Sequence, residues 1–188
     1  MRRRERGLAL ISSLLLLLII TLLALSMFRS FGVQEKIAGN LREKDRALHA
    51  AESAQQYAEW WLLQPGAIAG GTVVCGPGFL IGTLGQGQIC SNQLTQAPFN
   101  LLSVSALPWP AGVTFQPNGM SLAGNGANND ASYFGPPAFY IADLGPAADA
   151  QGEAYRVDAY GYGAAPSTVA VVESVYEVQQ GVLNRGGL

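Results

Sequence analysis

The sequence predicts an α+β protein in which a long N-terminal helix packs on a C-terminal antiparallel β-sheet head. Three observations predict this class. Residues 8–28 carry no charge, residues 29–64 continue with helical periodicity, and all ten prolines lie at or after Pro65. Because proline interrupts helices, the change of composition at Pro65 predicts the end of the helix and the start of the head.

The uncharged run of residues 8–28 is 21 residues long. A helix of that length spans about 31 Å, close to the thickness of a bilayer's hydrocarbon core. A secretory signal would end in a small-residue cleavage site, which Ser26, Met27 and Phe28 do not provide. The run therefore predicts a transmembrane helix.

The charges are unevenly distributed along the chain. Residues 1–7 hold four arginines against Glu5, whereas the segment from Pro65 onward holds only Arg156 and Arg185 against seven acids. Basic residues before a transmembrane helix favour a cytoplasmic N-terminus, which leaves the head outside the cytoplasm. The acidic head lacks the basic surface that nucleic-acid binding requires, so no direct nucleic-acid partner is expected.

Residues 29–64 predict an amphipathic continuation of the same helix, from Leu8 to Leu63. Apolar residues recur with helical spacing at Ile37, Leu41, Leu48, Ala51, Ala58 and Leu62. Gly32 and Gly39 weaken this helix by about 1 kcal/mol each relative to alanine. We expect the second half of the helix to pack on the head.

Residues 65–188 predict a β-rich head. Residues 72–75 and 87–90 predict short strands around a loop, and residues 154–160 and 168–178 alternate between apolar and polar residues as a hairpin does. The strand order between residues 65 and 151 stays open.

Cys75 and Cys90, the two cysteines, both lie in the head. In an oxidising compartment they would form a disulfide worth about 3 kcal/mol in the chain-entropy model. A metal site would need further cysteines or nearby histidines, and a redox pair would have only two residues between its cysteines.

The sequence predicts no enzyme, metal site or cofactor. His49 is the single histidine, and it lies on a helix that should pack rather than catalyse. A cluster of oxygen-bearing side chains does not follow an EF-hand spacing, so it predicts a loop rather than a calcium site: Asn125, Asn128, Asn129 and Asp130.

The N-terminal half resembles a known family. The basic leader ending in Gly7, the apolar helix beginning at Leu8 and its amphipathic extension resemble a type IV prepilin. Residues 35–54 are more specific, because their Ala-Gly-Asn and Ala-Ala-Glu-x-Ala elements resemble the signature of PilX-type minor pilins. The resemblance covers residues 4–60, and the C-terminal hairpin fits it loosely.

The resemblance implies that a prepilin peptidase cuts between Gly7 and Leu8 and that the new Leu8 amine is methylated. Left uncut, the leader arginines would enter an apolar filament core at a severe desolvation cost. The implied organisation is a leader (1–7), a transmembrane and filament-core helix (8–28), an amphipathic extension (29–64) and a periplasmic head (65–188). The alternative is that the arginines only set the membrane topology.

Ser12 departs from the family pattern. Most pilins have glutamate as the fifth residue of the mature chain, where it meets the N-terminal ammonium of the neighbouring subunit and acts in helix docking. A buried ammonium without a counter-charge is unfavourable. The serine suggests the hypothesis that this subunit sits at or near the pilus tip; the alternative is that a hydroxyl suffices.

The expected function is that of a structural minor pilin that primes type IV pilus assembly. The expected partners are the inner membrane, the prepilin peptidase, other minor pilins, the major pilin and a tip adhesin. The head would lie in the periplasm before assembly and in the extracellular pilus after it. Three alternatives stay open: a minor pseudopilin of a type II secretion system, a surface-binding adhesin module, or a membrane-anchored protein without a fibre.

Overall fold

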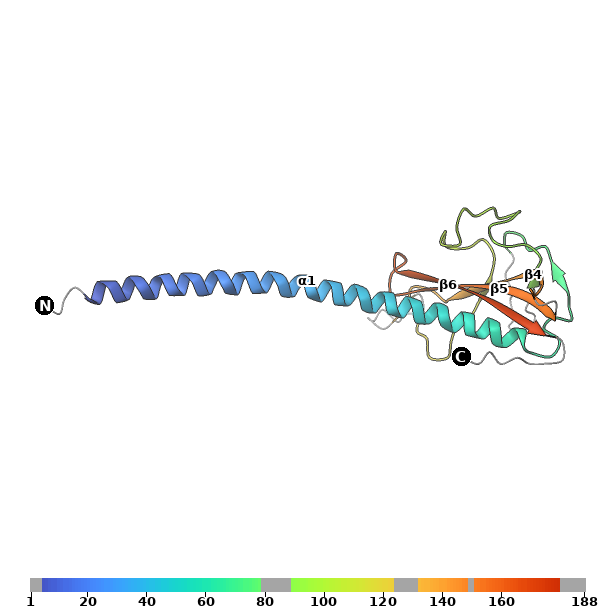
Figure 1. Cartoon of the computed structure of the whole chain (residues 1–188), viewed down its shortest axis with the longest axis horizontal. Coiled ribbons are helices and arrows are strands. Elements are labelled where there is room, and N and C mark those ends of the chain that lie inside the picture. The colour runs from blue at the N-terminus through green and yellow to red at the C-terminus, as the bar shows by residue number, and fades with distance from the viewer. Residues whose placement is uncertain (1–4, 79–88, 124–131, 149–150, 180–188) are drawn as a thin grey trace. The chain divides into compact units, whose positions relative to one another are not determined.

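The computed structural model describes residues 5–78, 89–123, 132–148 and 151–179 (Figure 1). The described chain contains one α-helix and six strands: α1 (Glu5–Leu62), β1 (Thr72–Val73), β2 (Ile89–Cys90), β3 (Val113–Thr114), β4 (Ala138–Pro146), β5 (Gly152–Tyr162) and β6 (Val169–Gln179). The chain divides into two compact units, residues 1–42 and residues 43–188. The helix spans the boundary, so its last five turns belong to the second unit.

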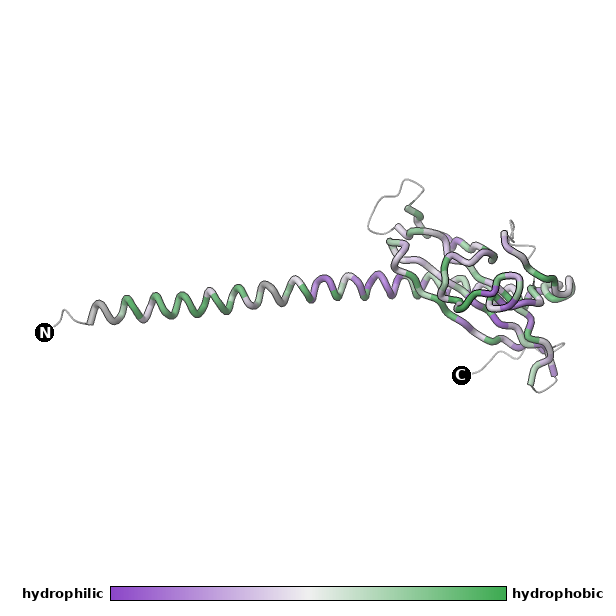
Figure 2. The backbone as a smooth tube through the Cα atoms, turned by 90° about the horizontal axis from the view of Figure 1, so that it is seen from above, coloured by the Kyte–Doolittle hydropathy of each residue, from purple (hydrophilic) through white to green (hydrophobic). Residues whose placement is uncertain are grey.

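The first unit is helical wherever it is described. Its apolar residues form a continuous run, and more hydrophilic residues follow along the same helix (Figure 2). The helix is long and apolar enough to cross a membrane, judged by its length and composition. The predicted helix from Leu8 to Leu63 is therefore confirmed to within a few residues.

The second unit contains a mixed sheet with the order β1-β2-β4-β5-β6, and β3 pairs with β4. The three long strands β4, β5 and β6 lie side by side and are antiparallel (Figure 1). The predicted hairpin forms β5 and β6. The pairings β1–β2 and β2–β4 are parallel, which makes the sheet mixed rather than wholly antiparallel. The α+β class is confirmed.

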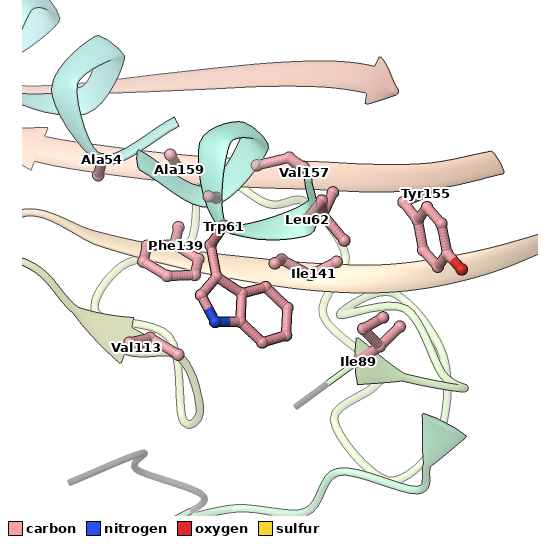
Figure 3. Close-up of a cluster of buried hydrophobic side chains, with 11 residues drawn as sticks. Ala54, Trp61, Leu62, Ile89, Val113, Phe139, Ile141, Tyr155, Val157 and Ala159 are labelled. Atoms are coloured by element: carbon pink, nitrogen blue, oxygen red, sulfur yellow. The ribbon is translucent and has the colours of Figure 1, made fainter. Parts of the chain in front are cut away.

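Within the second unit, the end of α1 packs on one face of the sheet. Small side chains make this contact: Ala47, Ala50, Ala51, Ala54 and Ala58 are buried. Larger residues close the same core further along, where Trp61 and Leu62 meet Phe139, Ile141 and Val157 (Figure 3). The predicted apolar stripe is therefore only partly right, because Ala51, Ala58 and Leu62 are buried whereas Leu48 is exposed.

Gly161 of β5 explains why the helix carries alanines here. A Cβ atom placed on Gly161 would lie 2.5 Å from Ala51 N and 2.6 Å from Ala50 Cβ. These distances are below any normal van der Waals contact. The helix therefore approaches the strand backbone more closely than any larger residue at Gly161 would allow.

The opposite face of the sheet has its own core, which is rich in aromatic rings. Trp109 and Tyr160 meet edge to face with their ring centroids 4.8 Å apart. The Trp109 indole N–H donates to the Val104 carbonyl oxygen at 2.6 Å, which satisfies its single polar atom. Trp109 lies in a loop between Pro108 and Pro110, and its side chain belongs to this buried cluster.

Candidate functional site: an exposed apolar helix and the head that follows it

The first part of α1 exposes its large apolar side chains to an unusual degree. From Leu10 to Met27 all the large apolar side chains are exposed, and their exposed fractions range from 48 % at Ile19 to 66 % at Ile11. An apolar surface of this extent on a soluble protein marks contact with a membrane or another protein. The residues carry no charge that would oppose burial in hydrocarbon.

Three hydroxyl side chains of this segment, those of Ser12, Ser13 and Thr21, bond to their own helix. Ser12 Oγ donates to the Ala9 carbonyl oxygen at 3.0 Å, and Ser13 Oγ donates to the Leu10 carbonyl oxygen at 2.9 Å. Thr21 makes the same bond to Leu18 at 2.8 Å. Hydroxyl groups paired in this way enter an apolar environment without leaving an unsatisfied donor.

The predicted processing site lies within the same helix. The structure places the backbone of Gly7 and Leu8 in α1, and Ser12 lies just over one turn after Leu8. Cleavage between Gly7 and Leu8 and methylation of Leu8 stay predictions. The docking role of Ser12 also stays a prediction, and its hydroxyl is bonded within its own chain.

At the start of the second unit, Glu43 and Arg46 fasten the helix to two loops. Arg46 Nη1 lies 2.7 Å from Glu43 Oε1. Glu43 Oε2 accepts a hydrogen bond from the Ala164 amide at 2.8 Å, and Arg46 Nη2 donates to the Ser132 carbonyl oxygen at 3.0 Å. The Arg46 guanidinium also stacks over the Tyr133 ring at 4.6 Å. These contacts fix the first turn of α1 within the head unit.

Cys75 and Cys90 form a disulfide in the structure, with their Cα atoms 5.4 Å apart. Both cysteines are buried, and the bond ties the segment after β1 to β2. Asn92 supports the same site, because its side chain accepts from the Cys75 amide at 2.8 Å and donates to the Cys75 carbonyl oxygen at 3.1 Å. Sequence reasoning did not identify Asn92.

A buried carboxylate, Asp158 on β5, was also not identified from the sequence. Arg156 Nε donates to Asp158 Oδ1 at 3.1 Å, and Arg156 Nη2 lies 2.5 Å from Glu173 Oε2 on β6. Asp158 Oδ2 has no hydrogen-bond partner within the described chain. Burial raises the pKa of the Asp158 carboxyl above its ordinary value, although Arg156 acts in the opposite direction. An Arg-x-Asp pair in an alternating strand was the available signal, since such residues share one face.

The buried phenol of Tyr140 adjoins this carboxylate. Tyr140 lies opposite Asp158 in the β4–β5 pairing, and its hydroxyl donates to the Asn92 carbonyl oxygen at 2.8 Å. Burial and the nearby Asp158 charge raise the pKa of Tyr140. The group stays neutral and donates a structural hydrogen bond, which links β4 to the disulfide region.

In residues 5–78, 89–123, 132–148 and 151–179, no three His, Cys, Asp or Glu side chains are placed to hold a metal ion. His49 is exposed and lies 3.2 Å from Glu52. The loop residues considered for calcium lie outside the described residues: Asn125, Asn128, Asn129 and Asp130.

The structure thus combines an apolar helix long enough to cross a membrane with a disulfide-bonded α+β head that follows it in the sequence. Residues 6–55 match the protein family model described as PilX N-terminal. Residues 6–55 therefore form a PilX-type type IV pilin N-terminal region, and the PilX pilin family is structural rather than catalytic. No curated protein and no solved structure matches the chain. The family match ends within α1, before the sheet begins.

Proposed function

We propose that the chain is a non-enzymatic minor pilin that primes assembly of a type IV pilus. The observation that carries the proposal is the coincidence of two features in one segment. The PilX-type region, residues 6–55, contains the helix that exposes its apolar side chains from Leu10 to Met27. A helix of this kind can leave the bilayer and keep its apolar surface covered by packing among other pilin helices.

The proposal includes processing and location. A prepilin peptidase cuts after Gly7, the Leu8 amine is methylated, and the head lies in the periplasm until assembly carries it into the extracellular fibre. The contacts on the apolar helix are made first by inner-membrane lipid and then by other minor pilins and the major pilin. A tip adhesin is the proposed partner of the head.

The tip position rests on Ser12. Its hydroxyl is bonded to the helix backbone and carries no charge that could pair with a neighbouring subunit's ammonium. The test compares a Ser12→Glu variant with a control variant at the next position, Ser13→Glu. We expect only Ser12→Glu to increase incorporation along the pilus shaft. Equal incorporation of Ser12→Glu and wild type would remove the support for the tip position.

The assembly role is tested by deleting the gene in its own host and counting surface fibres. We expect few or no fibres, with full recovery when the wild-type chain is returned. Immunogold labelling of the complemented strain should place the head at fibre ends. Normal fibre numbers together with loss of a secreted protein would instead favour a minor pseudopilin of a type II secretion system.

A further inference from the structure

The last strand of the sheet, β6, has an open edge within the described chain. It is the final strand in the order β1-β2-β4-β5-β6 and pairs only with β5 among the described residues. The strand is 11 residues long, whereas β1 at the opposite end of the order has 2 residues. Long open edges present unpaired backbone groups to any extended chain that approaches.

The register shows which residues turn their backbone outward. The Gly163 amide donates to the Thr168 carbonyl oxygen, which continues the β5–β6 ladder past the Tyr162–Val169 pair. Because only alternate pairs exchange bonds in an antiparallel ladder, the even-numbered residues of β6 bond to β5. The outward amides and carbonyls therefore belong to the odd-numbered residues, including Glu173, Val175 and Glu177.

These outward residues are also the exposed ones, and two of the three are acidic. Val175 is 62 % exposed, and Glu173 and Glu177 lie on either side of it on the same sheet face. On the other face, Ser174 Oγ donates to the Glu59 carboxylate at 2.7 Å. Carboxylates therefore flank the edge on both faces, and cross-strand pairs of opposite charge are the stabilising ones.

The charges of Glu173 and Glu177 also determine which kind of chain can pair with the edge of β6. A second copy paired through its own β6 would bring Glu173 and Glu177 of both chains onto one face of the joined sheet. Like charges so close across strands are destabilising. Glu173 already pairs with Arg156 on β5, so a lysine or arginine of an extended segment would meet its opposite charge chiefly at Glu177.

We propose that the open edge of β6 binds an extended basic segment of another protein by β-strand addition. The backbone of Glu173, Val175 and Glu177 supplies the hydrogen bonds, and the flanking carboxylates select basic side chains. This inference does not depend on the pilus role, because it uses only contacts within the head unit.

The test uses the full chain in neutral detergent and three synthetic nine-residue peptides. One alternates lysine and valine, one has the same sequence with every backbone amide methylated, and one alternates glutamate and valine. We expect the first peptide to bind at least tenfold more tightly than either control. Amide hydrogen exchange should slow at Glu173, Val175 and Glu177 on binding, and change little at Val172 and Ser174.

Two variants separate the backbone and charge contributions. Val175→Pro removes one outward amide at an edge position where proline is tolerated, and it should weaken binding at least tenfold. Glu177→Lys should shift preference toward the acidic peptide, a gain that misfolding cannot produce. Asp45→Lys makes the same charge change on exposed helix and should leave the preference unchanged.

Three results would overturn the proposal. Equal binding of the methylated peptide would mean that only charge attracts the probe. A second result is that the outward amides are already protected from hydrogen exchange in the free chain and lose that protection when residues 180–188 are removed. This result would mean that the chain covers its own edge. Protection that rises with protein concentration alone would identify a second copy as the occupant.

Discussion

The two ends of α1 use opposite side-chain sizes. In the first unit, bulky residues such as Leu17 project from the helix and are 64 % exposed. In the second unit, Ala51 and Ala54 are fully buried against the sheet. Both stretches are helical, so backbone conformation does not distinguish them. Side-chain size does: alanine permits close packing on the molecule's own sheet, whereas leucine provides a large surface that lipid or another helix must cover.

The two units are therefore stabilised in different ways. The head unit has a core on each face of its sheet and a disulfide. Among the described residues, none of the apolar segment is buried. Changes in the first unit should therefore affect membrane insertion and leave head stability unchanged, and changes in the second unit should do the reverse.

The largest expected effect comes from placing charge in the apolar segment. Replacing Leu17→Arg together with Leu18→Arg should make membrane insertion less favourable by about 6 kcal/mol, from insertion scales near the helix centre. Extraction of membranes at alkaline pH measures this, with Leu17→Met plus Leu18→Met as the matched control. The midpoint of head unfolding should not move; a large shift would contradict the separation of the units.

Removing the disulfide should destabilise the head by about 3 kcal/mol, because the open chain regains the entropy of its loop. The variant is Cys75→Ser with Cys90→Ser, and denaturant unfolding followed by tryptophan fluorescence measures the change. Asn92 would keep its bonds to the residue 75 backbone and hold part of the loop. Membrane insertion serves as the control and should match wild type.

Two glycine-to-alanine substitutions test the difference in packing between the two ends of α1. Gly161→Ala should destabilise the head by about 1–3 kcal/mol, because its new methyl group would collide with the backbone of α1. Gly32→Ala has open space around it and should strengthen the helix by up to about 1 kcal/mol. Thermal unfolding of the head and helix content by circular dichroism measure the two effects. Equal behaviour of both variants would contradict the close approach of α1 and β5.

The smallest expected effect is on the pH dependence of head stability. The pKa of Asp158 is raised in the folded state. Its contribution to the stability of the head is therefore fully present below the ordinary pKa of 3.8, and it is lost as pH rises through the folded-state pKa. Asp158→Asn should remove that decline and flatten the stability profile in this window. Glu177→Gln, at an exposed carboxylate on the same sheet, is the control. An unchanged profile in Asp158→Asn would show that another group titrates there.

The sequence was most informative where one pattern continued over many residues. The uncharged run and the composition change at Pro65 located α1 to within a few residues, and strict alternation located β5 and β6. β4 was missed because its first five residues, from Ala138 to Ala142, are all buried. A strand covered on both faces shows no alternation, so its pattern cannot be distinguished from that of a short buried helix.

Packing distances could not be read from the sequence. The helical pattern favoured the larger apolar residue Leu48, but the close approach at Gly161 selected neighbouring alanines for the contact. The two adjacent tryptophans at the end of α1 show the same effect: Trp61 is buried, whereas Trp60 is 53 % exposed. The partners of Asp158 and Asn92 depend on strand register, which pattern alone does not determine.

The assignment of α1 as a pilin assembly helix is tested most directly by the intact mass of the full chain, expressed with and without a prepilin peptidase. We expect the peptidase to remove residues 1–7 and leave a new N-terminus at Leu8, and we expect this amine to gain one methyl group. Gly7→Leu should block this change and provides the control. A chain that keeps its leader where a known prepilin is cut would contradict the central claim that α1 is a pilin assembly helix.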